Sequence, residues 1–106
     1  MKNLLFVCSR NRRRSPTAEQ LFAGRDDCEV ASAGLASDAE EILSSEDIDW
    51  ADIIFVMEKK QRAKLSQRFS AHLKNKRVVC LDIPDDYEYM QPELVDLLRA
   101  KVARYL

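Results

Sequence analysis

A cysteine and an arginine six residues apart are the first residues of this chain that could do chemistry. Cys8 follows an apolar run at residues 4–7, and Arg14 is followed by Ser15 and Pro16. A thiolate is a strong nucleophile, and a guanidinium can bind two oxygens of one phosphate group. The spacing therefore indicates chemistry on a phosphate ester, with the cysteine as the attacking group and the arginine as the clamp.

The segment between these two residues is a candidate phosphate-binding loop. A loop that joins a strand to a helix directs its N–H groups and the helix dipole at one point, which favours both a bound phosphate and the Cys8 thiolate. The loop has no glycine, and Asn11 is its only residue that readily adopts a left-handed conformation. We therefore expect a positive φ at Asn11, amides from Ser9 to Arg14 around the phosphate, and a hydroxyl donor to Cys8 at Ser15.

The elements that position this loop follow from the apolar pattern. Four short apolar segments are predicted strands, at residues 4–7, 28–33, 52–57 and 78–81. Four helices are predicted to follow them, the first with Ser15 as its N-cap and Gly24 after its end, then at 37–46, at 58–72 and from Pro92 onward. This alternation predicts an α/β fold: a single three-layer domain over residues 1–106, with a four-stranded parallel sheet flanked by helices on both faces.

A second group of reactive residues follows the fourth predicted strand. In parallel sheets, ligands bind beyond the carboxyl ends of the strands, so Cys8 and the loop 82–89 should share one rim. A carboxylic acid there can protonate a leaving oxygen and then activate water. The loop offers three candidates for this general acid, Asp82, Asp85 and Asp86.

These segments together resemble one known family. The run VCSRNRRRSPTAE resembles the active-site loop of the low-molecular-weight protein tyrosine phosphatases, which reads C-x-x-N-x-x-R-S-P-x-A-E. VASAGL and DWADIIFVMEKKQ resemble the end of the family's second strand and its third strand with the following helix. The resemblance covers most of the chain and points to a short bacterial branch. It implies hydrolysis of phosphotyrosine in proteins or of a small aryl phosphate, through a cysteinyl-phosphate, without a metal or other cofactor.

The resemblance also implies residue roles. Cys8 and Arg14 take the places of the nucleophile and the phosphate clamp. In IPDDYEY, Asp85 takes the place of the family's general acid, Asp86 replaces a proline, and Tyr87 matches an aromatic residue. On this resemblance we rank the candidate acids in the order Asp85, Asp86, Asp82. Tyr87 either flanks an aromatic phosphoester or packs on the domain, and the sequence leaves both interpretations open.

Three further arginines in the loop have no counterpart in this machinery. The family usually has glycine where Arg10 stands and an apolar residue where Arg12 stands, and Arg13 adds a third charge. Either they form a basic rim that attracts an acidic peptide, a nucleotide or another polyanion, or some of them form salt bridges. The expected salt-bridge partners were the nearby acids Glu19, Asp85, Asp86 and Glu88.

Composition limits the alternatives. The net charge of −1 speaks against a nucleic-acid binder, and the absence of a long apolar run predicts a cytoplasmic protein without a membrane partner. Three scattered cysteines without a C-x-x-C pair speak against a zinc site, and the separation of Cys28 from Cys80 speaks against an arsenate reductase. A phosphate-binding or phosphoprotein-binding module that has lost turnover is the main rival to an enzyme.

Overall fold

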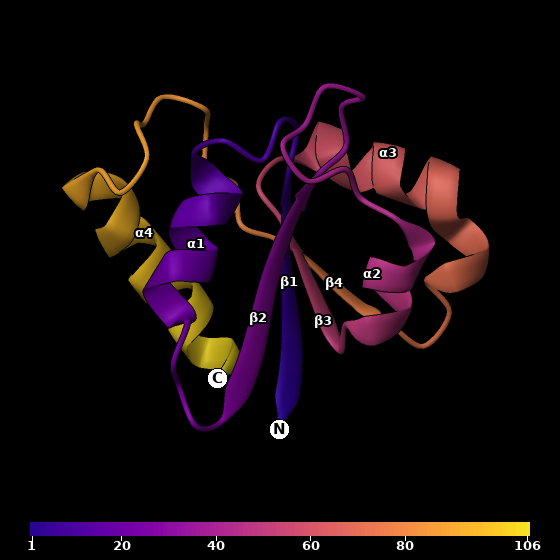
Figure 1. The fold of residues 1–106 in the computed structure, drawn as a ribbon, viewed down its shortest axis with the longest axis horizontal. Helices are drawn as coiled ribbons and strands as arrows, with labels where there is room; N and C mark the ends of the chain where they lie inside the picture. Colours follow the sequence, from indigo (N-terminus) through magenta and orange to yellow (C-terminus); the bar gives the residue numbers. More distant parts are fainter.

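Four parallel strands form the sheet at the centre of the computed structural model, which describes all residues from 1 to 106 (Figure 1). They are β1 (Lys2–Cys8), β2 (Cys28–Gly34), β3 (Ile53–Val56) and β4 (Arg77–Cys80), arranged in the order β2-β1-β3-β4. The four predicted strands are confirmed, with their ends slightly shifted. Residues 4–7 of β1 are fully buried because β1 lies between two strands and helices cover both of its faces.

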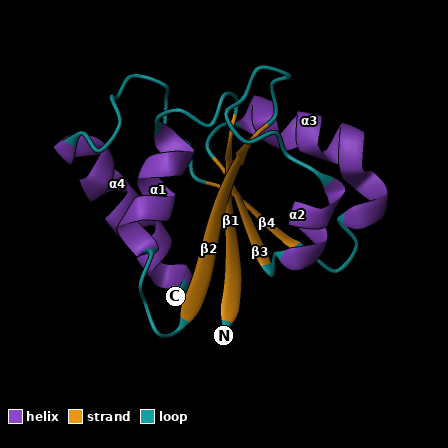
Figure 2. Cartoon of the chain, viewed as in Figure 1, coloured by secondary structure: helices purple, strands orange, loops and turns teal.

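Helices cover both faces of this sheet, as predicted (Figure 2). α1 (Arg14–Phe22) and α4 (Pro92–Val102) lie on one face, and α2 (Ser45–Trp50) and α3 (Lys59–Phe69) lie on the other. Short 3₁₀ turns, Ser70–His72 and Ala103–Tyr105, follow α3 and α4. Each face buries its own apolar cluster, so the three-layer α/β architecture is confirmed. None of these helices is both long and apolar enough to cross a membrane.

The first helix begins earlier than the sequence predicted. Arg13 is the N-cap of α1, and Ser15 lies inside the first turn, so the prediction that Ser15 caps the helix is wrong. Its hydroxyl is instead hydrogen-bonded within the Cys8 loop. At the other end the prediction holds, because Gly24 follows the cap residue Ala23 with a φ of 82°, a conformation that glycine adopts freely.

The predicted helix at residues 37–46 is also wrong. The helix on this side is α2, which begins at Ser45. Ser44 and Asp47 exchange side-chain hydrogen bonds with each other's backbone N–H groups, and this capping box sets the start of the helix. The residues before Ser44 form a loop that folds back over the end of β1, where Ala36 N–H donates to the carbonyl of Ser9.

Candidate active site

Cys8 lies at the carboxyl end of β1, at the base of the loop that leads to α1. Its side chain is 3% exposed. The backbone N–H of Asn11 donates to Cys8 Sγ at 3.2 Å, and Ser15 Oγ lies 2.9 Å from the same sulfur. Asn11 has a φ of 57°, which confirms the predicted left-handed residue. This one strained position turns the loop back so that its own amide faces the cysteine.

Ser15 connects the sulfur to the residue that shapes the loop. Its hydroxyl is fully buried and lies 2.8 Å from Asn11 Oδ1 as well as 2.9 Å from Cys8 Sγ. A hydroxyl has one proton, so it can donate to only one of these two acceptors at a time. With a thiol at Cys8, Ser15 donates to Asn11 and the thiol donates to Ser15. With a thiolate, the serine proton turns to the sulfur and stabilises its charge.

The backbone of the loop has a row of unused donors. The N–H groups of Ser9, Arg10, Arg12, Arg13 and Arg14 have no acceptor within the protein. Arg10, Arg12 and Arg13 are exposed, so a ligand can reach these N–H groups from solvent. A row of unpaired backbone N–H groups beside a buried nucleophile is an arrangement that can bind an anion. Together with the amino-terminal end of α1, these donors are arranged so that they can bind an anion, and we call this group of N–H donors beside Cys8 the cradle.

The Arg14 side chain is buried and held along one edge. It is 3% exposed, and Nη1 donates to Glu58 Oε1 at 2.6 Å and to the carbonyl of Ile83 at 2.7 Å. Nη2 and Nε make no hydrogen bond, although Nε lies 3.7 Å from Asp85 Oδ1. The free Nε–Nη2 edge is a pair of donors with the geometry that binds two phosphate oxygens.

Glu58 holds the other edge of Arg14 and is itself charged in the fold. Partial burial disfavours the charged form of Glu58, but the hydrogen bond and the charge of Arg14 outweigh burial and lower the pKa of Glu58 below its ordinary value. A carboxylate that remains ionised keeps the guanidinium oriented. Sequence analysis did not single out Glu58.

The start of α3 also supports the loop from below. Gln61 is 1% exposed, and its Oε1 accepts hydrogen bonds from the N–H groups of Met57 and Glu58. Its Nε2 donates to Ser9 Oγ at 3.2 Å, which ties the helix to the phosphate loop. Gln61 was missed as well. Both residues lie in DWADIIFVMEKKQ at the carboxyl end of a central strand, and that position was the available signal.

Behind the loop, the end of β2 leaves no room for a side chain. A Cβ atom added to Gly34 would lie 2.6 Å from Ala39 Cβ and 2.7 Å from the carbonyl oxygen of Ser9. The chain after Gly34 then runs along the phosphate loop, and Glu40 N–H donates to the carbonyl of Arg10. Glycine at this position therefore allows two backbones to approach closely.

The loop after β4 brings one of the three candidate acids to the site. It is anchored at Ile83, whose N–H donates to the carbonyl of Met57, and at Met90, whose N–H donates to Thr17 Oγ1, each at 2.9 Å. Between these anchors, Asp85 lines the same pocket as Arg14 and is 58% exposed. A solvated carboxyl group beside the phosphate cradle is well placed to exchange protons.

The remaining predicted residues of that loop lie outside the pocket. Asp86 is exposed and does not line it. Asp82 has a φ of 53° and lines a neighbouring hollow. Tyr87 packs against the apolar cluster on the α1–α4 face. The geometry therefore brings Asp85, and neither of the other two aspartates, to the cradle.

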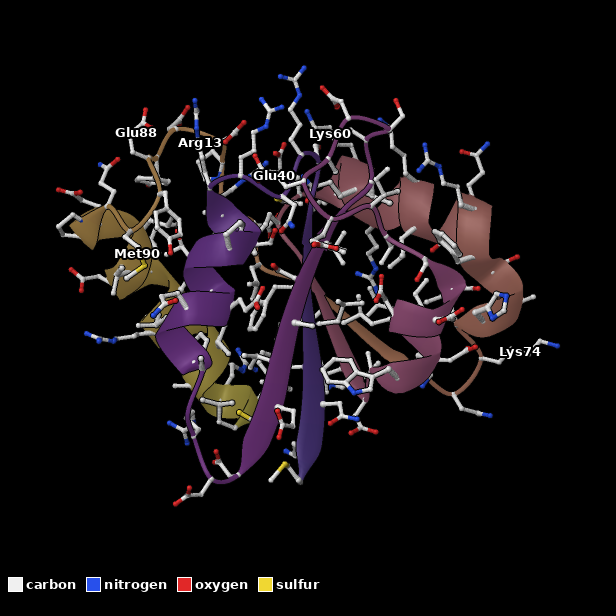
Figure 3. The ribbon with its side chains drawn as sticks, in the orientation of Figure 1. Arg13, Glu40, Lys60, Lys74, Glu88 and Met90 are labelled. Carbon is white, nitrogen blue, oxygen red and sulfur yellow. The ribbon has the colours of Figure 1, made fainter.

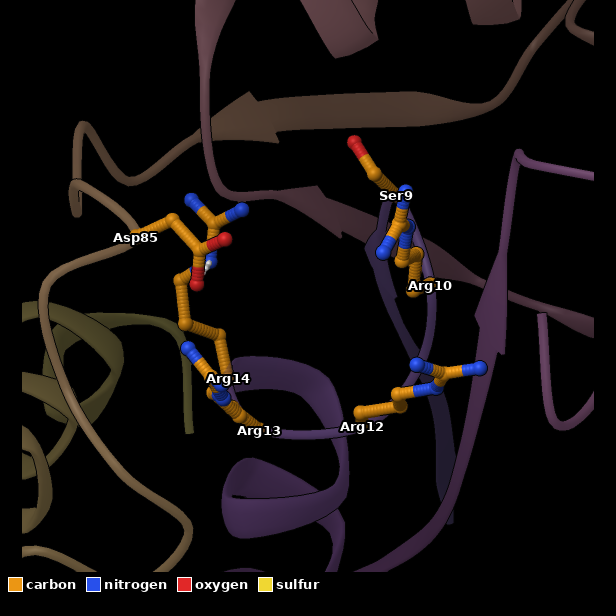
Figure 4. A pocket seen from close by; sticks show the side chains of 6 residues that line it. All are labelled: Ser9, Arg10, Arg12, Arg13, Arg14 and Asp85. Atoms are coloured by element: carbon orange, nitrogen blue, oxygen red, sulfur yellow. Dashed lines mark ion pairs between the residues drawn. The ribbon is translucent and has the colours of Figure 1, made fainter. Parts of the chain in front are cut away.

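The pocket itself is small and polar. It has a volume of about 170 Å³ and no hydrophobic residue in its lining, which consists of Ser9, Arg10, Arg12, Arg13, Arg14 and Asp85 (Figure 4). The lining thus contains four of the arginines that stand out in the sequence and one of the candidate acids. The four arginines outnumber the single aspartate in this lining, so the lining favours an anionic ligand.

The three additional arginines each face one carboxylate at the rim. Arg10 lies 3.8 Å from Asp38, Arg12 lies 3.8 Å from Glu40, and Arg13 lies 3.8 Å from Glu88. Figure 3 shows the Arg13, Glu40 and Glu88 side chains along this rim. Glu88 is one of the expected salt-bridge partners, whereas Asp38 and Glu40 were not expected because they lie in the segment wrongly predicted as a helix.

Comparisons with known proteins give a consistent result for the fold. No protein-family profile matches the sequence, and no curated protein matches it. Among solved structures, the arginine phosphatase YwlE from Geobacillus stearothermophilus superposes with a TM-score of 0.79 at 23% identity, over 99% of this chain and 92% of that one. A low-molecular-weight protein tyrosine phosphatase from Streptococcus pyogenes superposes with a TM-score of 0.80 at 18% identity, over 100% and 94%.

A third solved structure has a ligand bound. Wzb from Vibrio vulnificus, in complex with benzylphosphonate, superposes with a TM-score of 0.79 at 22% identity, over 98% of this chain and 96% of that one. The matches therefore extend over almost the whole of both chains in each case. This chain has the fold of the low-molecular-weight protein tyrosine phosphatases, which is also the fold of the arginine phosphatase YwlE.

Proposed function

We propose that this protein hydrolyses phosphomonoesters through a covalent phosphate on Cys8. One observation carries the proposal: a buried cysteine lies at the base of a loop whose amides are unpaired, beside a guanidinium with one free edge. Donors fixed in advance around the place where negative charge develops are a large source of catalysis. The same arrangement would hold the three oxygens of a phosphoryl group during transfer.

Two steps account for the reaction. Cys8 Sγ attacks phosphorus, the bond from phosphorus to the ester oxygen breaks, and Asp85 donates a proton to the departing oxygen. A water molecule then attacks the cysteinyl-phosphate as Asp85 takes its proton, and the sulfur leaves as a thiolate that Ser15 and the Asn11 amide stabilise. No redox change occurs. Apart from the substrate and water, every group that reacts or stabilises charge in these steps belongs to the chain.

Phosphotyrosine in proteins, or a small aryl phosphate, is the substrate class that we propose. Support comes from the fold shared with a tyrosine phosphatase and from the benzylphosphonate bound to Wzb, because this ligand places a phosphonate on a benzyl group. A variant of an arginine phosphatase with a phosphorylated serine in its active site supports the covalent step. A thiolate nucleophile suits the reducing cytoplasm, which we propose as the compartment.

The test compares wild type with Cys8→Ser and Asp85→Asn on two substrates. Cys8→Ser should reduce kcat for 4-nitrophenyl phosphate by about 10⁴-fold or more, because a serine hydroxyl is a much weaker nucleophile and leaving group than a thiolate. Asp85→Asn should reduce kcat/KM for phenyl phosphate by about 10²-fold, and much less for 4-nitrophenyl phosphate, because kcat/KM reports the first step and nitrophenolate leaves without a proton. Asp86→Asn is the matched control for the loss of an acidic residue from the same loop.

Three results would contradict the proposal or part of it. No hydrolysis of either ester by wild type would exclude phosphomonoesterase activity toward aryl phosphates. If benzylphosphonate still bound, the protein would be a phosphate-binding module. Full activity of Asp85→Asn on phenyl phosphate, with a loss in Asp86→Asn, would assign the acid to Asp86.

A further inference from the structure

We propose that the pocket is built for phosphomonoesters that carry a second anionic group, and that Arg10 and Arg12 bind this group. The inference rests on the proposed function, because it names the substrate class of the same site. The second group is a carboxylate or a phosphate on the part of the substrate that leaves. Arg10 and Arg12 thereby determine specificity rather than take part in phosphoryl transfer.

The positions of the arginines separate the two roles. Arg10 and Arg12 lie across the pocket from Arg14 and Asp85 (Figure 4). The scissile phosphate has the loop amides and the free edge of Arg14 as partners, and the departing oxygen must face Asp85. The rest of the substrate then passes between the two walls, with Arg10 and Arg12 on one side of it.

The donors of Arg10 and Arg12 are not used by the protein. Neither side chain makes a hydrogen bond, and the nearest carboxylate oxygens are 3.8 Å away, beyond hydrogen-bond distance. The side chains of Arg10 and Arg12 are 63% and 50% exposed, so these ion pairs are weak. A substrate anion at hydrogen-bond distance would form stronger, charge-assisted bonds than the pairs it disturbs.

The lining of the pocket offers no apolar surface to the body of a ligand. Ligand sites commonly bind the body of a ligand with apolar and aromatic side chains, but this lining contains none. Of the two interpretations that the sequence left open for Tyr87, the structure agrees with packing on the domain, because Tyr87 contacts the apolar cluster. An uncharged aryl group therefore meets few contacts here, whereas an anionic one meets two guanidinium groups.

Two carboxylates lie near these guanidinium groups at the mouth without entering the pocket. Asp38 and Glu40 belong to the loop that is bonded to the phosphate loop through Glu40 N–H and the carbonyl of Arg10. Neither Asp38 nor Glu40 lines the pocket. Because the arginines line the pocket and the carboxylates do not, a ligand inside the pocket faces the guanidinium groups on this wall. The hydrogen bond from Glu40 N–H to the carbonyl of Arg10 also keeps the segment with Asp38 and Glu40 next to the loop with Arg10 and Arg12.

The test measures binding of two phosphonates that differ in one charge. The probes are 4-carboxybenzylphosphonate and 4-carbamoylbenzylphosphonate, similar in size and neither one hydrolysable, titrated calorimetrically into the intact protein. In wild type the carboxylate should bind about fivefold to tenfold more tightly than the amide. In Arg10→Gln/Arg12→Gln this ratio should fall to about one. Arg25→Gln, which removes an exposed arginine paired with Asp27 at the other end of β2, should keep the wild-type ratio.

Each other outcome overturns the proposal. Equal affinity of the two phosphonates for wild type, a ratio that survives the double replacement, or a failure of both probes to bind would each exclude a second-anion site at these arginines. The measurement does not require turnover. Hydrolysis of 4-nitrophenyl phosphate by the same preparation therefore decides the proposed function separately, and either idea can fail alone.

Discussion

Arg14 and Arg12 lie two residues apart in one loop, but their surroundings are opposite. Arg14 is 3% exposed and bonded to Glu58 and Ile83 at 2.6 and 2.7 Å, whereas Arg12 has a half-exposed side chain and only a long ion pair. The same contrast separates two groups of residues in the site. The buried residues Cys8, Asn11, Arg14 and Ser15 form what we call the base, and the exposed Arg10, Arg12 and Arg13 form the rim.

The contrast follows from what each region must do. Displacement at phosphorus needs reacting groups fixed to within a fraction of an ångström, and burial with paired hydrogen bonds fixes them. Recognition of a varied second group needs side chains that can move, and exposed arginines with weak partners provide this mobility. Substitutions at the base should therefore alter both the free energy of unfolding and the catalytic rate. Substitutions at the rim should alter only the selectivity for ligands.

The largest effect is expected behind the base, at Gly34. A Cβ in Gly34→Ala would lie under 3 Å from Ser9 O and from Ala39 Cβ, so the backbone of the phosphate loop must shift. We expect a loss of about 2 kcal/mol in the free energy of unfolding and at least about tenfold in kcat for an aryl phosphate. Urea unfolding and steady-state kinetics measure the two effects.

Gly24→Ala is the matched control for this change. Gly24 has a φ of 82° and nothing near its Cβ position, so alanine there should cost about 1 kcal/mol through backbone strain. It lies at the end of α1 away from the loop and should leave kcat unaltered. Equal kinetic losses in both variants would mean that the activity follows general stability rather than the geometry of the loop.

The next effect concerns Glu58, which anchors Arg14. The Arg14 pair lowers the pKa of Glu58 in the fold, so its contribution to stability is complete above the ordinary value of 4.5 and is lost as the pH falls through the folded value. Glu58→Gln should therefore be about 1–2 kcal/mol less stable than wild type at neutral pH, and this deficit should shrink in acid.

Unfolding in urea near pH 7 and near pH 3 measures this difference. Glu29→Gln, an exposed position without an ion pair, should show no comparable deficit at either pH. A deficit in Glu58→Gln that stays the same in acid would show that lost packing, and not the charge of Glu58, is responsible. Packing, and not the charge of Glu58, would then hold Arg14 in place. Electrostatic interactions would no longer distinguish the base from the rim.

The base of the pocket was largely predictable because its information is local. Cys8, Asn11 and Arg14 lie within seven consecutive residues, and the left-handed turn at Asn11 follows from the absence of glycine in the loop. The four strands were predictable for a related reason, since short apolar runs are typical of a sheet that is covered on both faces.

The support of the base was not predictable in the same way. Glu58 and Gln61 contact the loop from more than forty positions away. Their place after β3 was the only signal, because their residue types do not distinguish them from the other polar residues of this charged segment. Residues 37–44 were misread because their conformation is set by backbone bonds to Ser9 and Arg10 rather than by their own helical propensity. For the same reason, Asp38 and Glu40 were not predicted as partners of Arg10 and Arg12.

The smallest effect is expected from those partners. Asp38→Asn/Glu40→Gln removes two carboxylates that attract Arg10 and Arg12 from outside the pocket. Each pair is long and exposed, so stability should change by less than about 0.5 kcal/mol. With the competing charges gone, the guanidinium groups are free for a ligand, and 4-carboxybenzylphosphonate should bind about twofold to threefold more tightly. The same substitution at an exposed acid elsewhere, Asp27→Asn, should leave this affinity unaltered.

The sign of this last effect separates two versions of the rim. If the carboxylates only compete with the ligand, their removal strengthens binding of the anionic probe. If they chiefly hold the arginines in place over the mouth, their removal weakens binding, because each guanidinium must then be ordered by the ligand itself. The exposed fractions and the 3.8 Å separations favour competition, since side chains held so loosely lose little order when their partners are removed. A weakened affinity would show that Asp38 and Glu40 position Arg10 and Arg12 for the ligand. These two pairs would then belong with the fixed residues of the base rather than with the mobile rim.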